Sequence, residues 1–364
     1  MLIETRPLNT PSAVSDTAAR QPFAVHLLDN AAEPSWDAFV AQADHSSIVH
    51  LVRWREILSD VLGAECLYWV ATDPSGTCQG VLPVARVKSR LFGHYLVSLP
   101  FLNYGGPLGS PAARRRLVDE AVAEARRSNA DLLELRTRYA EDLALPVAAR
   151  KLTVLRELPA SRDELWNALP SKLRSQVRRP LKAGLATRFG ADQQAPFYEV
   201  FTRTMRDLGT PVLPRAWFER IGSAFAELVV FGAVYASGSD EPLAAGCGFV
   251  WGGEFEMTWA ASRRDQAPVA ANMLLYWSFM EEMIRRGVRV FNFGRCTPGG
   301  GTHRFKQQWG GSDVPLPWTA YAPRGRLATP SPNDSTYAWG PRLWRWLPLP
   351  IANRLGPQLV RLLP

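Results

Sequence analysis

Cysteine and histidine are scarce and scattered in this sequence. Its 364 residues include four cysteines and five histidines, and they form neither a C-x-x-C pair nor an H-E-x-x-H motif. A disulfide framework is therefore not expected, and neither is a metal site of the usual spacing. The composition favours a reducing compartment, so we expect a cytoplasmic protein that binds no metal.

Long apolar runs are missing as well. No stretch of about 18 apolar residues occurs, and we therefore expect no segment that spans a membrane. Residues 1–22 lack the apolar centre of a signal peptide and are expected to form a disordered N-terminus.

The overall composition is that of a globular chain with surplus positive charge. Hydrophobic residues make up 46% and charged residues 21%, which excludes a disordered chain. The length suffices for two domains of ordinary size. A net charge of +8 indicates an anionic partner, which could be nucleic acid, a phosphorylated substrate or an acidic membrane surface.

A pattern of three strands, a helix and a closing strand occurs twice. Alternating and helical apolar spacings place the first copy at residues 66–72, 80–88, 94–99, 111–128 and 131–136. The second copy lies at residues 228–236, 243–250, 254–261, 269–286 and 288–295. A duplicated α/β (α+β) unit explains the length better than one large sheet does.

The repeat suggests a division of the chain into five segments. They are a disordered N-terminus (1–22), a first domain (23–160), a basic helical connector (161–190), a second domain with a glycine-rich loop (191–322) and a tail (323–364).

The connector carries basic residues and no acidic residue between 165 and 191. Leu173, Val177 and Leu181 recur at helical spacing and predict one buried stripe, and Pro180 is expected to kink or end the helix. Arg174 and Arg178 share the same spacing and form a neighbouring basic ridge. Either this ridge is a solvated face or it binds an anion.

A glycine-rich stretch at residues 291–310 follows the closing strand of the second copy. Three consecutive glycines at 299–301 indicate positive φ or a close approach of the backbone to another group. We expect a loop here that carries Arg304, Phe305 and Lys306, with Trp309 beside them. A glycine-rich hairpin with solvated basic residues is the alternative interpretation.

The tail differs in composition from the rest of the chain. Residues 323–336 are rich in Pro, Ser, Thr and Asn, as in a linker, and no acidic residue follows Asp334. Residues 337–364 carry three tryptophans and four arginines, and their prolines forbid one continuous helix. Short amphipathic pieces here would suit an anionic membrane surface, unless they pack on the second domain.

Several segments together resemble the FemAB-like branch of the GNAT-type acyltransferases. The similarity is strongest to the FemAB-related proteins associated with bacterial exosortase (PEP-CTERM) and exopolysaccharide gene clusters. The segments that carry the resemblance are 99–107 (LPFLNYGGP), 133–136 (LELR), 172–179 (KLRSQVRR), 205–211 (MRDLGTP), 272–277 (NMLLYW), 291–295 (FNFGR) and 301–310 (GTHRFKQQWG).

The resemblance implies two GNAT-like domains in tandem, each a mixed, largely antiparallel sheet flanked by helices. It also implies transfer of an acyl or aminoacyl group to an amine or a similar nucleophile. In Fem ligases the donor is aminoacyl-tRNA, and a Phe-Lys pair lines the catalytic channel, which corresponds to Phe305 and Lys306. A basic residue of the K-x-R-x-x-x-R helix binds substrate phosphate there, which points to Arg174 or Arg178. The helical hairpin that engages tRNA in Fem ligases has no counterpart in this sequence.

Acyl transfer requires a cation near the developing oxyanion and a group that removes a proton. We expect Lys306 and Arg304 to stabilise the oxyanion, and Asp207 to be the best candidate for a general base, with His303 second. The side chains expected to line the substrate cleft are Asn103, Tyr104, Asn272, Tyr276, Arg295 and Trp309.

No bound cofactor is expected, and the acyl donor stays open among acyl-CoA, acyl carrier protein and aminoacyl-tRNA. The stretch 265–272 lacks the glycines with which GNAT domains hold the pyrophosphate of CoA, which disfavours the usual acetyl-CoA mode.

We therefore expect an N-acyltransferase or aminoacyltransferase that acts on an anionic cell-envelope or exopolysaccharide precursor. It would work in the bacterial cytoplasm, with peripheral contact to the inner face of the membrane through residues 337–364. A non-catalytic accessory protein that binds a glycolipid or polysaccharide intermediate is the main alternative. RNA binding through residues 172–188 is disfavoured because no aromatic residues are interleaved there for base stacking, and no DNA partner is expected.

Overall fold

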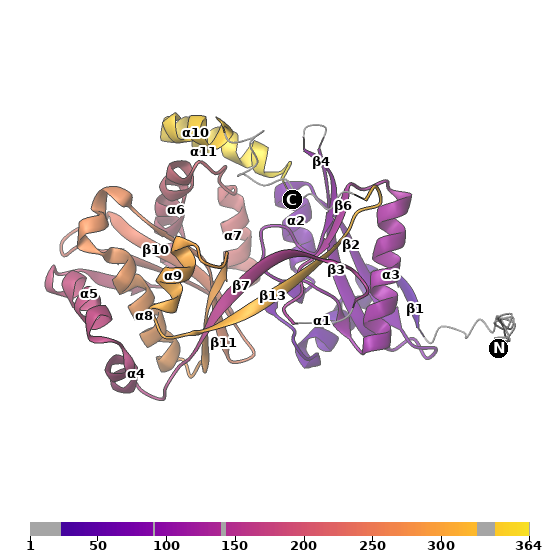
Figure 1. Ribbon diagram of the computed structural model, residues 1–364, viewed down its shortest axis with the longest axis horizontal. Helices are drawn as coiled ribbons and strands as arrows, with labels where there is room; N and C mark the ends of the chain where they lie inside the picture. The colour runs from indigo at the N-terminus through magenta and orange to yellow at the C-terminus, as the bar shows by residue number, and fades with distance from the viewer. Residues whose placement is uncertain (1–22, 90–91, 140–142, 326–338, 364) are drawn as a thin grey trace, which may run out of the picture.

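One continuous mixed sheet runs through the whole molecule. The computed structural model describes residues 23–89, 92–139, 143–325 and 339–363. The strand order is β1-β2-β3-β4-β6-β13-β7-β12-β11-β10-β9-β8, with the short β5 paired to β3. Figure 1 shows the first half in indigo to magenta and the second half in rose to orange, joined by two long crossing strands. The predicted disordered N-terminus (1–22) lies outside the described residues, as does most of the predicted linker.

The elements have the following bounds. The strands are β1 (Ala24–Leu27), β2 (Glu65–Thr72), β3 (Cys78–Ser89), β4 (Gly93–Val97), β5 (Leu108–Gly109), β6 (Leu132–Leu135), β7 (Val147–Glu157), β8 (Ala186–Phe189), β9 (Val229–Tyr235), β10 (Pro242–Trp251), β11 (Glu254–Ser262), β12 (Val290–Cys296) and β13 (Ser312–Tyr321). The α-helices are α1 (Glu33–Gln42), α2 (Trp54–Leu62), α3 (Pro111–Arg127), α4 (Arg162–Ala168), α5 (Ser171–Lys182), α6 (Gln194–Leu208), α7 (Arg215–Ala224), α8 (Ala271–Arg285), α9 (Gly301–Gln307), α10 (Trp339–Trp346) and α11 (Leu349–Val360). No helix in the described part of the chain is long and apolar enough to cross a membrane.

The repeat predicted from the sequence is present in the fold. The order β2-β3-β4-α3-β6 in the first half corresponds to β9-β10-β11-α8-β12 in the second. In each half the helix connects two parallel strands, β4 with β6 and β11 with β12, whereas the other strand pairs described are antiparallel. A helical crossover is the usual way to join parallel neighbours.

Two strands that the sequence analysis did not assign fuse the halves. β7 pairs with β12 and β13, and β13 pairs with both β7 and β6. The repeat therefore forms one large sheet, contrary to the expectation of separate sheets. β13 contains Pro315 and Pro317, which disfavour a strand inside a sheet. Both prolines lie where β13 pairs with β7 alone, since β6 pairs only with Thr319–Tyr321.

The two faces of the sheet bury separate cores. Alternate residues of β2 divide between them, because Tyr68 packs toward α1 and α2 while Trp69 packs toward α3. The first core continues into the second half, where α6 and α7 join it. Trp54 of α2 lies 5.6 Å from Trp217 of α7, ring centre to ring centre. Opposite them, α5 and α8 cover the other face of the second half.

Two of the three residues of the apolar stripe predicted on the connector helix are buried. Leu173 and Val177 are buried against the second half, but Leu181 is 43% exposed. Pro180 takes its place in the core and lies in the last turn of α5, which ends two residues later at Lys182. The helix therefore ends two residues after Pro180, near the predicted position. The prediction that Leu181 is buried is wrong.

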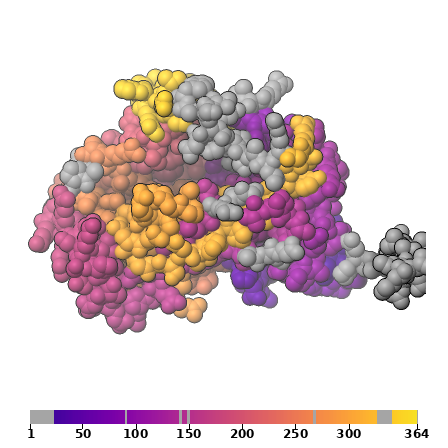
Figure 2. Space-filling view, viewed as in Figure 1, coloured from indigo at the N-terminus to yellow at the C-terminus, as the bar shows by residue number. Residues whose placement is uncertain are grey.

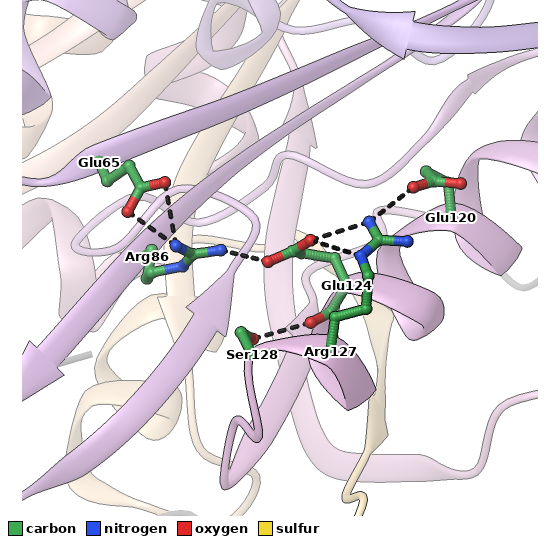
Figure 3. A network of polar contacts seen from close by, with 6 residues as sticks. All are labelled: Glu65, Arg86, Glu120, Glu124, Arg127 and Ser128. Atoms are coloured by element: carbon green, nitrogen blue, oxygen red, sulfur yellow. Dashed lines mark hydrogen bonds and ion pairs between the residues drawn. The ribbon is translucent and has the colours of Figure 1, made fainter.

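A network of ion pairs fastens α3 to the sheet of the first half (Figure 3). Arg86 of β3 contacts Glu65 of β2 and Glu124 of α3, and Arg127 pairs with Glu120 and Glu124. Partly exposed pairs of this kind each contribute about 1 kcal/mol or less. Each of the two arginines is paired with two carboxylates, so the network helps to hold α3 on the sheet and offers no unpaired cation to an anionic ligand.

Candidate active site

The parallel strands β11 and β12 separate at the centre of the molecule. Their ladder covers only Glu254–Glu256 against Val290–Asn292, although both strands continue beyond it. Gly294 adopts φ of +72°, and a Cβ there would lie 2.6 Å from the carbonyl oxygen of Met257. Glycine is therefore required where β12 turns away from β11.

Buried polar groups from both halves meet at this separation. Asn103, from the loop after β4, donates its side-chain amide to the carboxylate of Glu256 on β11. Asn292 of β12 is fully buried, and its amide donates to the Tyr104 hydroxyl at 2.8 Å and to Glu254 at 2.8 Å. Each half thus supplies polar groups that satisfy those of the other, so the site forms only when both halves pack together.

Glu256 combines burial with access to a cavity. Burial raises the pKa of its carboxyl to about 7. The hydrogen bond from Asn103 acts in the opposite direction and lowers this pKa. A cavity of about 490 Å³ adjoins it, lined among others by Glu254, Arg138, Trp251 and His45. Arg138 pairs with Glu254, whereas the carboxylate of Glu256 is held by the amide of Asn103. A carboxyl with a pKa near neutrality can both accept and return a proton.

Lys306 lies close enough to Glu256 for the two charges to interact, and it is buried. It is 4% exposed, and its Nζ donates to the carbonyl oxygens of Gly294 at 2.6 Å and of Arg295 at 3.0 Å. Burial lowers the pKa of its ammonium to about 8, while the charge of Glu256 acts in the opposite direction. Two of its three N–H donors are used, and no third partner occurs among the described residues.

A group of cations surrounds the end of β12. The Arg295 guanidinium lies over one side of Trp318 at 4.7 Å, and Arg136 also lies 4.7 Å from that ring. Burial, and then the Arg136 charge, lower the pKa of Arg295 to about 10. Lys151 of β7 has a lowered pKa as well, through burial and the neighbouring Arg295. Since Arg136 is neutralised by Glu134, Arg295 and Lys151 are the cations that favour an anion here.

The residues after the three glycines form helix α9 and not the loop that the sequence predicted. Residues two apart on a helix point to different sides, so Arg304 and Lys306 do not act together. Arg304 is exposed and donates to the carbonyl oxygen of Gly299 at 3.0 Å. His303 accepts from the Gly299 N–H at 2.9 Å through Nδ1, and its Nε2 lies 2.9 Å from Asp313. His303 therefore fixes the glycine turn to β13 and is not free to act as a base.

Three predicted cleft residues form an aromatic cluster. The ring of Tyr276 on α8 lies 5.0 Å from that of Phe305 and 6.2 Å from that of Trp309. Tyr276 and Trp309 are buried and Phe305 is partly buried. These rings pack α9 against α8, and by that packing they hold Lys306 in place.

Asp207 lies elsewhere in the fold. It lies in the last turn of α6, where its carboxylate pairs with Arg206 at 2.7 Å. Arg206 also reaches the carbonyl oxygen of Leu347, just after α10. This motif holds the C-terminal helices, so the structure does not support Asp207 as the general base.

The basic ridge of α5 is also separate from the polar groups at β11 and β12. Arg178 lies 5.0 Å from the ring of Trp166, and Arg174 donates to the carbonyl oxygen of Asn167 at 3.3 Å. Both contacts are local to α4 and α5. Asn272 is partly buried in the first turn of α8, and its side chain makes no hydrogen bond with another described residue.

The sequence analysis missed Glu256, Asn292 and Lys151. A signal for Glu256 was present, because Glu254 and Glu256 stand two apart in a predicted strand and must share one face. Carboxyl groups on a strand whose other neighbours are apolar can indicate a buried polar site. No described group of three or more His, Cys, Asp or Glu side chains is placed to hold a metal ion.

Comparisons with known proteins agree with this architecture. Residues 171–307 match the family described as Acetyltransferase (GNAT) domain. A comparison with curated protein sequences finds no match.

Solved structures share the fold over most of the chain at low sequence identity. The crystal structure of FemX superposes with a TM-score of 0.62 at 15% identity, over 82% of this chain and 97% of that one. A tandem GNAT protein from the clavulanic acid biosynthesis pathway gives 0.55 at 12% identity, over 85% and 100%. The C-terminal domain of an Agrobacterium fabrum protein named as a lysylphosphatidylglycerol synthetase gives 0.52 at 14% identity, over 80% and 92%. The fold is that of two GNAT-like units in tandem, the second unit carries the matched acetyltransferase domain, and together these support an acyltransferase.

Proposed function

We propose that this protein is an N-acyltransferase whose reaction takes place where β11 and β12 separate, with Glu256 as the general base. The observation that carries the proposal is a buried carboxyl with a pKa of about 7 beside a cavity of about 490 Å³. A general base works best when its pKa is near the working pH.

The proposed proton transfers involve two groups, Glu256 and Lys306, whose charges interact. Ionised Glu256 takes a proton from the ammonium of the acceptor, which frees the nitrogen lone pair to attack the carbonyl carbon of the donor. The remaining N–H of Lys306 stabilises the oxyanion that forms. The bond to the leaving group then breaks with its electron pair on the leaving group, to which protonated Glu256 returns the proton. The acylated nitrogen releases its second proton to water, which leaves a neutral amide. Arg304, which points away from Lys306, takes no part.

The acceptor of this reaction carries negative charge. Arg295 and Lys151 leave a positive surplus at the end of β12, where the charge of Arg295 lowers the pKa of Lys151 and that of Arg136 lowers the pKa of Arg295. An anion bound there would relieve that repulsion. Phosphorylated or lipid-linked precursors of the cell envelope or of an exopolysaccharide have the required charge, and we propose them as the acceptor class.

The test is turnover by purified protein. It is incubated with acetyl-CoA, an acyl-acyl carrier protein or an aminoacyl-tRNA, each with a membrane lipid extract, and acylated products are detected by mass spectrometry. We expect product with one donor, and a loss of about 10²- to 10⁴-fold in rate for Glu256→Gln. Asp207→Asn removes a carboxylate outside the site and serves as the matched control, expected to keep full rate.

Two outcomes would overturn the proposal. Saturable binding of an extract component without turnover would indicate an accessory binding protein. Full activity of Glu256→Gln would show that another group removes the proton.

A further inference from the structure

The last two helices form an ordered surface fastened to the second half. α10 and α11 lie along α6 in Figure 1, where they are yellow. Gly209 caps α6 with φ of +79°, and a Cβ there would lie 2.4 Å from the carbonyl oxygen of Pro341. Gly356 of α11 packs in the same way on Val212. Since glycine is needed at both contacts, the two helices are seated closely and keep one face turned outward.

That outward face is apolar. Leu343 is 59% exposed and Trp346 is 86% exposed on α10, while Ile351 and Leu355 are exposed on α11. The buried residues of α11 are Ala352, Gly356 and Val360, on its opposite side. Figure 2 shows these yellow helices at the outer edge of the molecule. A surface on which Trp, Leu and Ile are exposed together over two consecutive helices is typical of a contact with another protein or a membrane.

Positive charge accompanies the apolar residues. Arg342, Arg345 and Arg354 are exposed beside them, and none forms an ion pair with another described residue. No acidic residue occurs from 335 to 364. Asp207, which lies under α10, is neutralised by Arg206. The face is therefore apolar and cationic without internal compensation.

We infer that this face, made of the outward sides of α10 and α11, docks on a bilayer of anionic phospholipid. A tryptophan beside arginines matches the interface of such a bilayer, where the ring lies at headgroup level and the guanidinium groups meet phosphate. A second copy of the chain fits less well, since its own arginines would be brought against these. The inference concerns where the protein resides and does not depend on the reaction proposed above.

The test is co-sedimentation of the full chain with vesicles of phosphatidylcholine, alone or mixed with phosphatidylglycerol. We expect binding to the mixed vesicles that weakens as salt is added. Arg342→Gln and Arg354→Gln should each weaken it about fivefold, and Trp346→Ser on the order of tenfold. These side chains are exposed, so the variants are expected to keep the wild-type melting temperature.

A matched pair of substitutions separates docking from general charge attraction. Arg179→Gln with Lys182→Gln removes, from exposed positions of α5, the same charge as Arg342→Gln combined with Arg354→Gln, and should leave vesicle binding unchanged. Equal weakening by this pair, or unchanged binding of Trp346→Ser, would overturn the inference. So would a dimer, seen without lipid by sedimentation velocity, that Trp346→Ser dissociates while no vesicle is bound.

Discussion

The side-chain amide of Asn103 donates a hydrogen bond to the carboxylate of Glu256, and this contact joins the two halves at the cavity. The bond favours ionised Glu256, whereas burial favours the neutral acid. The pKa of about 7 is the balance of the two. The first half thus adjusts the acidity of a carboxyl that belongs to the second.

Asn103→Ala removes the bond and should raise the pKa of Glu256 by about one unit, as expected for a hydrogen bond to a charged group. The acidic limb of the pH–rate profile should therefore move to higher pH. A limb that stays in place in Asn103→Ala would mean that another group is being titrated.

Glu256→Gln should change the pH dependence of stability. The pKa of Glu256 is raised from 4.5 to about 7 by folding, so the folded state holds the proton more tightly. The stability that the protonated Glu256 carboxyl contributes to the fold is present below pH 4.5 and is lost as the pH rises through 7. The variant should therefore be more stable than wild type at pH 8, by on the order of 3 kcal/mol, and should show no gain below about pH 5. Urea unfolding at both pH values measures this, and a pH-independent difference would contradict it.

Lys306→Ala should lower the free energy of unfolding, whereas the same substitution at an exposed lysine would change it little. The substitution leaves the carbonyl oxygens of Gly294 and Arg295 without their donor, at a cost of about 2 to 4 kcal/mol at pH 7. Folding lowers the pKa of Lys306 from 10.5 to about 8, so wild type gains stability as the pH rises from 8 to 10.5. The loss in the variant should accordingly be larger at pH 10 than at pH 7. Equal losses at the two pH values in urea unfolding would show that Lys306 titrates normally.

Arg295→Gln should weaken binding of the anionic acceptor. Loss of a charged contact at this site should raise KM about tenfold and reduce its dependence on salt. Arg304→Gln removes the same charge from an exposed position of α9 and is the matched control. The assignment of Arg295 fails if both variants change KM alike.

Much of the repeat could be predicted from the sequence because its strands and helices have regular apolar spacing. Residues 254–261 were expected as a strand, and β11 extends one residue further, to Ser262. β7 and β13 could not be assigned in the same way. Their pairing joins residues far apart in the chain, and the prolines of β13 contradict the local pattern of a strand.

Some of the residues at the candidate site were named from the sequence. The sequence analysis expected Asn103 and Tyr104 to line a cleft, and the structure places them in contact with Glu256 and Asn292 of the second half. The sequence did not predict the directions in which the side chains of residues 301–307 point, because these depend on whether the segment is a loop or a helix. That difference separates Arg304 from Lys306, and it explains why an exposed charge and a buried one were expected to act together.

The most direct test of the account is the pH dependence of kcat/KM for wild type and Glu256→Gln, once the acyl donor has been identified. Wild type should show an acidic limb with an apparent pKa of about 7, set by Glu256. Glu256→Gln should lose about 10²-fold or more in rate and lack that limb, while Glu254→Gln retains it. An unchanged limb in Glu256→Gln would contradict the assignment of Glu256 as the general base.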